Sequence, residues 1–299
     1  MEITKALLIH NDAAGSAAGS LVSSAVAVLA PSIKELDIIQ TSGPGDGENI
    51  CLKRGSGVDV VFILGGDGTV HECINGLTQL DHPPIVGLLP GGTCNDFVRS
   101  LGMPVDVTQS ARMMLEGRTI DINLGLANGR VFTNFFGVGL ITETSENIDS
   151  NLKNSLGKLS YFISTLQTIR TAIPFAFEME ADGKLIQDEA VMIYIANGRS
   201  LGSSPLPFAQ DALKDGQFDI LIIRQTGLPL LKEVLSRKPE GEWRPKNDSI
   251  LYYKARNIKL RTDGEKQADT DGEVYLSTPV EISVLDHKLS FLVGGPDAI

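Results

Sequence analysis

The residues best suited to chemistry lie in one glycine-rich stretch, residues 64–72, which reads LGGDGTVHE. Residues 58–64 are almost all apolar and rich in β-branched side chains, which indicates a strand buried on both faces of a parallel sheet. Apolar residues then recur at helical spacing over residues 70–80. The stretch is therefore predicted to join a strand to a helix N-terminus, where glycines permit close approach and unpaired amides attract phosphate.

Asp67 is the unexpected residue of this stretch, because a carboxylate among phosphate-binding amides repels the ligand unless a divalent cation lies between them. We therefore expect Asp67 to act with magnesium. A second turn, residues 90–97 (PGGTCNDF), follows the next predicted strand and has the same composition. Because neighbouring parallel strands end at one sheet edge, Asp67 and Asp96 are predicted around one metal ion and one triphosphate. The alternatives are plain connecting turns, with Asn95 or Asp96 only capping a helix.

The elements around these turns alternate in type. Strands are predicted at 5–9, 36–40, 58–64 and 85–88, with helices between them, and this alternation is typical of a doubly wound parallel sheet. Beyond residues 118–125 the pattern changes to alternating runs separated by Asn128-Gly129 and Asp182-Gly183, which favour β-hairpins. We therefore predict an α/β nucleotide-binding domain at 1–122, rejoined by 288–299, and an antiparallel β domain at 123–287.

Composition narrows the classes of function. The chain has 299 residues, a net charge of −11 and three cysteines. The negative charge argues against nucleic acid as a partner, and against electrostatic recruitment to anionic lipid. The sequence shows neither a membrane span nor the apolar core of a signal peptide, so a cytoplasmic location is expected.

Six features in order resemble the diacylglycerol kinase catalytic family. They are GGDGTVHE at 65–72, GGTCNDF at 91–97, Asp121, Asn197-Gly198, Lys214-Asp215-Gly216 and Asp271-Gly272-Glu273. The resemblance implies a phosphofructokinase-like α/β domain, a β-sandwich-like second domain and an active site in the cleft between them. It also implies a lipid kinase that uses ATP and Mg²⁺, with diacylglycerol converted to phosphatidic acid as the expected reaction.

The resemblance also implies roles for individual residues. Glu273 would take the proton of the lipid hydroxyl, with Asp271 as its neighbour, and Asp121 would join Asp67 and Asp96 in a metal-linked network. Asp215 would hold a second, structural magnesium ion, together with backbone carbonyls of about Ala212 and Gln217. The implied nucleotide-binding residues are Asn11, Gly15, Thr41, Gly65, Gly66, Asp67, Gly68, Thr69, His71, Glu72, Thr93 and Asn95.

Two departures from the family pattern leave alternatives open. Asp12 stands where relatives carry a proline in the first loop, and residues 200–210 (SLGSSPLPFAQ) lack the usual glycines and methionine. That apolar loop either touches a bilayer, shapes the acceptor pocket or is simply packed. An amphipathic helix is predicted at 157–170, covering a sheet or bordering a lipid pocket.

The alternative functions are NAD kinase-like transfer to a soluble acceptor and a weakly catalytic, nucleotide-dependent lipid sensor. A transient contact with membrane lipid is the expected partner interaction, and a homodimer is compatible with the sequence. The glycine turn identifies the phosphoryl donor. The acceptor depends on the later motifs.

Overall fold

The computed structural model describes residues 2–11, 18–142, 172–206, 208–209, 213–225, 245 and 248–295. The contacts divide the chain into two compact units. The first comprises residues 1–122 and 287–299, and the second comprises residues 123–286.

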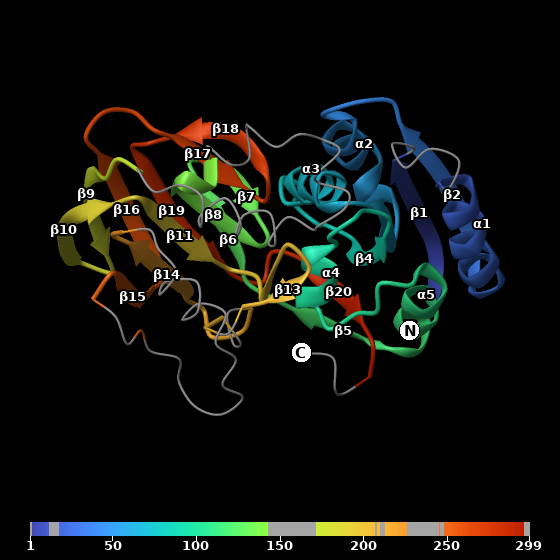
Figure 1. Ribbon diagram of the computed structural model, residues 1–299. Helices are drawn as coiled ribbons and strands as arrows, with labels where there is room; N and C mark the ends of the chain where they lie inside the picture. Colours follow the sequence, from blue (N-terminus) through green and yellow to red (C-terminus); the bar gives the residue numbers. More distant parts are fainter. Residues whose placement is uncertain are drawn as a thin grey trace. The chain divides into compact units, whose positions relative to one another are not determined.

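The first unit contains a six-stranded sheet in the order β2-β1-β3-β4-β20-β5 (Figure 1). Its strands are β1 (Ile3–Asn11), β2 (Ile33–Thr41), β3 (Val60–Gly65), β4 (Ile85–Pro90), β5 (Arg118–Asp121) and β20 (Ser290–Val293). Its helices are α1 (Ala18–Leu29), η2 (Ala30–Ser32), α2 (Asp46–Arg54), η3 (Gly55–Gly57), α3 (Asp67–Leu77), α4 (Asp96–Ser100) and α5 (Val107–Glu116).

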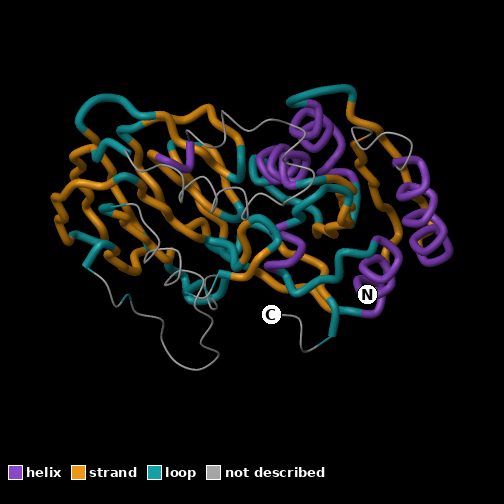
Figure 2. Tube along the Cα trace, viewed as in Figure 1, coloured by secondary structure: helices purple, strands orange, loops and turns teal. Residues whose placement is uncertain are grey.

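Strand direction decides where helices and loops lie in this sheet. Strands β1, β2, β3, β4 and β20 pair in parallel, and only β5 runs antiparallel to its neighbour β20. The chain goes from β1 outward to β2 and then back across β1 to β3. Because such crossovers are right-handed, α1 covers one face while α2 and α3 cover the other (Figures 1 and 2). The order therefore reverses at β1 and β3, the position where open α/β sheets bind ligands.

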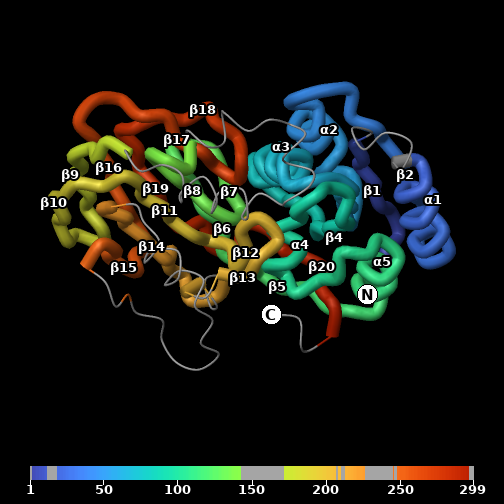
Figure 3. The backbone as a smooth tube through the Cα atoms, in the orientation of Figure 1, coloured from blue at the N-terminus to red at the C-terminus, as the bar shows by residue number. Residues whose placement is uncertain are grey.

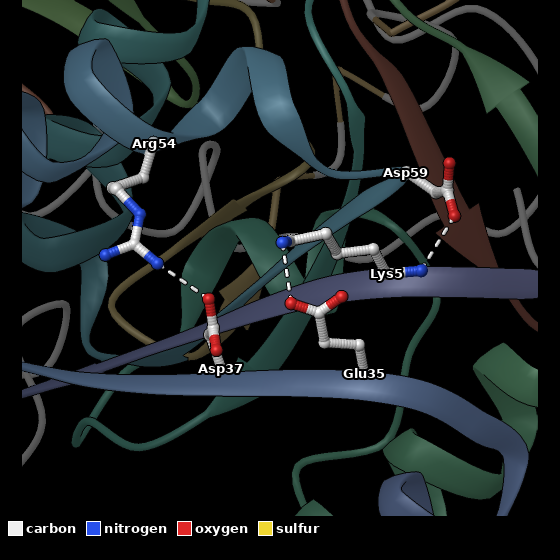
Figure 4. Close-up of polar contacts among 5 residues, drawn as sticks. All are labelled: Lys5, Glu35, Asp37, Arg54 and Asp59. Carbon is white, nitrogen blue, oxygen red and sulfur yellow. Dashed lines mark hydrogen bonds and ion pairs between the residues drawn. The ribbon is translucent and has the colours of Figure 1, made fainter.

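Polar contacts connect β1, β2, the end of α2 and the residue before β3 (Figure 4). Lys5 on β1 pairs with Glu35 on β2 at 2.6 Å, and Arg54 at the end of α2 pairs with Asp37 at 2.6 Å. The Asp59 carboxylate accepts the backbone amide of Lys5 at 2.9 Å. Surface pairs of this kind contribute about 0–1 kcal/mol each. The buried strands therefore supply most of the stability.

The second unit is a sandwich of two antiparallel sheets (Figure 3). One has the order β10-β9-β16-β19-β6-β7 and the other β15-β14-β11-β8-β17-β18, with a separate pair β12-β13. The bounds are β6 (Leu124–Ala127), β7 (Arg130–Phe132), β8 (Phe135–Gly139), β9 (Phe175–Ala181), β10 (Lys184–Ala190), β11 (Met192–Ala196), β12 (Ser200–Leu201), β13 (Ser204–Pro205), β14 (Phe218–Ile223), β15 (Ile250–Ala255), β16 (Asn257–Thr262), β17 (Gln267–Thr270), β18 (Glu273–Ser277) and β19 (Val280–Leu285).

Alternating side chains build two apolar layers in this unit. On β11, Ile193 and Ile195 join the core between the sheets, together with Phe136 and Leu260. Met192 and Tyr194 point to the opposite face and pack in a second cluster. The central strands of the second sheet are therefore buried on both faces, which explains their near-continuous apolar sequence.

The predicted fold class is confirmed. The hairpins expected at Asn128-Gly129 and Asp182-Gly183 join β6 to β7 and β9 to β10, and all four residues have positive φ. The helix predicted at 157–170 lies outside the described residues. Among the described helices, none is long and apolar enough to cross a bilayer.

Candidate functional site

The two glycine turns of the first unit meet backbone to backbone after β3 and β4. Gly65 pairs with Pro90 in the ladder, and the Gly91 amide donates to the Gly65 carbonyl at 3.0 Å. A Cβ built on Gly92 would lie 2.4 Å from the Gly66 Cα. Only glycine permits this approach, which brings the N-terminus of α3 beside the second turn.

The carboxylates of the two turns come together as predicted. The Asp96 amide donates to Asp67 Oδ1 at 2.8 Å. Ligand atoms of Asp67, Cys94 and Asp96 all lie within 4.8 Å of one another. The carboxylates suit a hard cation such as Mg²⁺, whereas the thiol does not. A carboxylate has about four acceptor sites, so the amide bond to Asp67 is compatible with a metal bound at the same group.

Asn95 shapes the second turn from within. Its Nδ2 donates to the Gly92 carbonyl at 2.7 Å, and its Oδ1 accepts the Gly92 amide at 2.9 Å. Its backbone is left-handed, with φ of 52°. The side chain of Asn95 thus closes the loop on itself and directs the Asp96 amide at Asp67. Thr93 is exposed in the same loop.

The amide groups at the start of α3 are the part of this site suited to an anion. Gly66 is the N-cap of α3, and as a glycine it has no side chain to cap the helix. The first amides of α3 lie at the positive end of the helix dipole. Asn11, the last residue of β1, donates from Nδ2 to Thr69 Oγ1 at 3.3 Å. Thr41 ends β2 and is buried. The predicted Asn11 and Thr69 therefore meet at the switch point of the sheet.

Two predicted nucleotide-binding residues of α3 bind other parts of the protein. Glu72 accepts the amides of Gly45 at 2.8 Å and Gly47 at 3.0 Å. It therefore holds the loop before α2. The His71 side chain is 2% exposed, and its Nε2 lies 3.4 Å from the Asn75 amide nitrogen. Their contact with a nucleotide stays a prediction.

Asp121 ends β5 and is not in the cluster that Asp67 forms with Cys94 and Asp96, so its predicted part in a metal-linked network stays a prediction. It pairs with Ser290 in the sheet and accepts the Ser290 hydroxyl at 2.5 Å. Ser290 is the first residue of β20, which runs parallel to β4. Because β5 runs the opposite way, its last residue lies at the amino edge of the sheet, whereas Asp67 and Asp96 follow the carboxyl edge.

In the second unit, the predicted acidic turn joins β17 to β18 through Asp271 and Gly272. Their φ values are 58° and 97°, as a two-residue hairpin turn requires. The Asp271 carboxylate is 4% exposed. Its Oδ2 accepts the amide and hydroxyl of Thr133 at 2.7 and 3.1 Å, and its Oδ1 accepts the amides of Asn134 and Phe135 at 2.7 and 3.1 Å. Asp271 is therefore an anchor for the turn.

Glu273 begins β18 and is exposed. Its carbonyl accepts the Thr270 hydroxyl at 3.4 Å, and the Gly272 amide donates to the buried Asp269 carboxylate at 2.7 Å. The turn is thus rigid around a carboxylate that faces solvent. This arrangement is compatible with a general base for an incoming hydroxyl.

Asn197 and Gly198 bind the same segment that anchors Asp271. Asn197 Nδ2 donates to the Thr133 carbonyl at 2.7 Å, and the Gly198 amide donates to the Asn134 carbonyl at 2.7 Å. A Cβ on Gly198 would lie 2.5 Å from Asn134 Oδ1. Thr133 and Asn134 are functional neighbours that sequence reasoning missed, because they stand between two short strands and belong to no motif we recognised.

The unusual loop at 200–210 is packed where it is described. Leu206 and Phe208 are each 6% exposed. The rings of Phe208 and Tyr194 pack edge to face, with their centroids 6.5 Å apart. Of the three alternatives for this loop, the buried positions of these two side chains favour the packed one.

At the turn predicted to hold a structural magnesium ion, the aspartate pairs with a lysine. Lys254 Nζ pairs with Asp215 Oδ2 at 2.7 Å, and the Gln217 amide donates to Asp215 Oδ1 at 3.0 Å. Asp219, four residues later, is fully buried, and burial raises its pKa to about 6. Gly15, Ala212 and Asp12 lie outside the described residues.

A parallel α/β unit with an acidic, glycine-built phosphate site, followed by a sandwich presenting a rigidly held glutamate, has the features of a kinase. Residues 5–127 match the family described as "Diacylglycerol kinase catalytic domain", and residues 137–293 match the "YegS C-terminal NAD kinase beta sandwich-like domain". The chain therefore belongs to the diacylglycerol kinase family of lipid kinases.

Relatives agree with this membership. A Staphylococcus aureus protein (strain Mu3 / ATCC 700698) named "Putative lipid kinase" is 33% identical over 235 residues, which are 79% of this chain and 77% of the relative. A structure from Bacillus anthracis str. Sterne, described as a "putative diacylglycerol kinase", superposes with a TM-score of 0.90 at 36% identity. The match covers 100% of this chain and 98% of the Bacillus anthracis chain. A second similar structure, described as a diacylglycerol kinase of the same organism, has a TM-score of 0.87 at 34% identity.

Proposed function

We propose that this protein transfers the γ-phosphoryl group of ATP to the hydroxyl of diacylglycerol, with Mg²⁺ as cofactor, and so forms phosphatidic acid. The observation that carries the donor half is the contact of the two glycine turns, where the Asp96 amide donates to Asp67 at 2.8 Å. This contact brings two carboxylates beside the amides that begin α3. Acidic groups next to an anion site are favourable only when a cation lies between them and the phosphates.

The first unit binds the donor. The N-terminal amides of α3 receive phosphate oxygens, and Asn95 fixes the loop that carries Asp96. Asp67 and Asp96 are the residues that would hold Mg²⁺, which when bound neutralises charge on the phosphate oxygens. Membership of a kinase family supports this use of a nucleotide and a divalent metal.

The second unit supplies the base. Glu273 accepts the proton of the lipid hydroxyl as that oxygen forms its bond to phosphorus. The bond from phosphorus to the bridging oxygen breaks in the same step, and ADP leaves. Asp271 takes no proton in this scheme, because its carboxylate is already bound to three amides and a hydroxyl. It fixes the turn from which Glu273 projects.

The acceptor is proposed to be a membrane lipid reached by transient contact. The relatives are named for lipid and diacylglycerol kinases, which favours a lipid acceptor over NAD. With a net charge of −11, attraction to anionic headgroups gives no assistance, so apolar contact must hold the substrate.

A panel of acceptors tests the proposal. Purified protein is incubated with labelled ATP and Mg²⁺ and with diacylglycerol, a sphingoid base, phosphatidylglycerol or NAD. We expect label in phosphatidic acid. Fastest transfer to NAD would support the soluble-acceptor alternative, and ATP binding without transfer to any acceptor would support a lipid sensor.

The donor site is tested by Asp67→Asn. Removing one metal-binding carboxylate should lower transfer by at least ~10²-fold with every acceptor, since Lewis-acid stabilisation amounts to several kcal/mol. Asp81→Asn, a change at an exposed aspartate of the same unit, is the matched control and should retain wild-type turnover.

A further inference from the structure

The turn at residues 213–217 is surrounded by basic groups. Lys254 Nζ lies 2.7 Å from Asp215 Oδ2, and Arg256 Nη1 donates to the Gly216 carbonyl at 3.5 Å. The other Asp215 oxygen accepts the Gln217 amide at 3.0 Å. Both oxygens of the one acidic side chain in this turn therefore already accept hydrogen bonds from the protein.

Strand pairing, rather than a chance rotamer, places Lys254 at this position. Lys254 on β15 is the direct cross-strand partner of Asp219 on β14, so their side chains share one face of the sheet. Its Nζ lies 3.6 Å from Asp219 Oδ1. Tyr252, two residues earlier on the same face, donates its hydroxyl to that oxygen. The ammonium group thus bridges two carboxylates, Asp215 and the fully buried Asp219.

A divalent cation does not fit this arrangement. Mg²⁺ requires close, near-octahedral oxygen ligands, and the lysine ammonium binds the Asp215 oxygen that such an ion would use. The guanidinium of Arg256 binds the neighbouring carbonyl and also pairs with Asp286. An ion at this turn would meet two positive side chains at short range, which repel it.

We propose that the Lys254 ammonium replaces the divalent cation that the family resemblance implies at this turn, so that residues 213–217 are ordered without metal. The proposal is independent of the lipid kinase function, because it concerns only groups of the second unit. It predicts that divalent cations act on this protein through the donor site and not through the second unit.

Manganese binding without nucleotide tests the proposal, since Mn²⁺ replaces Mg²⁺ and is visible by electron paramagnetic resonance and anomalous scattering. Crystals of the wild type soaked in Mn²⁺ should show no anomalous peak within coordination distance of Asp215. Lys254→Met leaves two carboxylates without their cation, and we expect it to bind one additional Mn²⁺ per chain at this turn. Lys254→Arg keeps the charge and should show no gain.

Lys259→Met removes an exposed lysine from β16, the next strand along the chain, and is the matched control, with wild-type Mn²⁺ binding expected. An anomalous peak beside Asp215 in the wild type would overturn the proposal, and this measurement decides even if Lys254→Met fails to fold. An unchanged Mn²⁺ count in folded Lys254→Met would overturn it equally. Because no turnover is measured, an error in the proposed kinase reaction leaves these outcomes unaffected.

Discussion

The buried carboxylate of Asp271 gives the sharpest test of how the acceptor turn is built. Each of its oxygens accepts two hydrogen bonds, from Thr133 on one side and from Asn134 and Phe135 on the other. Asp271→Asn keeps the shape of the side chain but replaces one acceptor oxygen by an NH₂ group. That group would face two donors.

The magnitude follows from the number of donors left without an acceptor. Two buried donors lose their partner, at about 1–3 kcal/mol each, so Asp271→Asn should lower the free energy of unfolding by ~2–6 kcal/mol. Turnover should also fall, because the turn that carries Glu273 loses its attachment to residues 133–135. The shift is measured by urea unfolding followed by circular dichroism, with equal slopes for the two proteins.

The comparison variant is Glu281→Gln, which removes the same charge from an exposed position on β19. It should change the unfolding free energy by less than ~0.5 kcal/mol. If Asp271→Asn proved as stable as Glu281→Gln, the carboxylate bonds would not hold the turn, and the role given to Asp271 as an anchor would be refuted.

Two further predictions concern other parts of the chain. Gly92→Ala places a Cβ 2.4 Å from the Gly66 Cα, so it should destabilise the first unit by ~1–3 kcal/mol and reduce transfer. The control is Gly57→Ala, whose added Cβ meets no atom within 4 Å, and it should change neither stability nor transfer. Because burial raises the pKa of Asp219 from 3.8 to about 6, its contribution to stability is complete below pH 3.8 and is lost as pH rises through 6. Asp219→Asn removes this dependence. The unfolding free energy of the variant minus that of the wild type should therefore rise by about 2 kcal/mol between pH 4.5 and pH 7.5. Urea titrations at each pH measure this difference in unfolding free energy. A difference that stays constant across the range would contradict the pKa assigned to Asp219.

The sequence was sufficient for the local units of the fold. Apolar strands followed by glycine turns predicted β3 with α3 and β4 with α4, and the Asn-Gly and Asp-Gly pairs predicted two hairpins of the sandwich. These signals are local, because backbone sterics and hydrophobic periodicity act over a few residues. The meeting of Asp67 with Asp96 was also predictable, since adjacent parallel strands end at one edge.

The remaining site geometry depends on pairings between distant segments. Asp121 pairs with Ser290, 169 residues later, because β20 fixes the position and direction of β5. The lysine at Asp215 comes from a strand 39 residues further along. No local pattern reports which strands become neighbours, so a closer reading of the motifs could not have predicted either of these contacts.

Glu72 is a different case, since its contacts with Gly45 and Gly47 join two helices that are adjacent in the fold. The motif GGDGTVHE includes this glutamate, and the sequence alone could not separate residues that bind a ligand from residues that hold the loop in place. The hydrogen bonds show that Glu72 holds the loop before α2.

The central claim, phosphoryl transfer to a lipid with Glu273 as the base, is tested most directly by the turnover of Glu273→Gln. Labelled ATP and diacylglycerol micelles are supplied to the variant and the wild type at saturating substrate. The account predicts a fall in kcat of ~10²- to 10⁴-fold with unchanged unfolding, since the side chain is exposed at the start of β18. Turnover near the wild-type rate in this folded variant would contradict it.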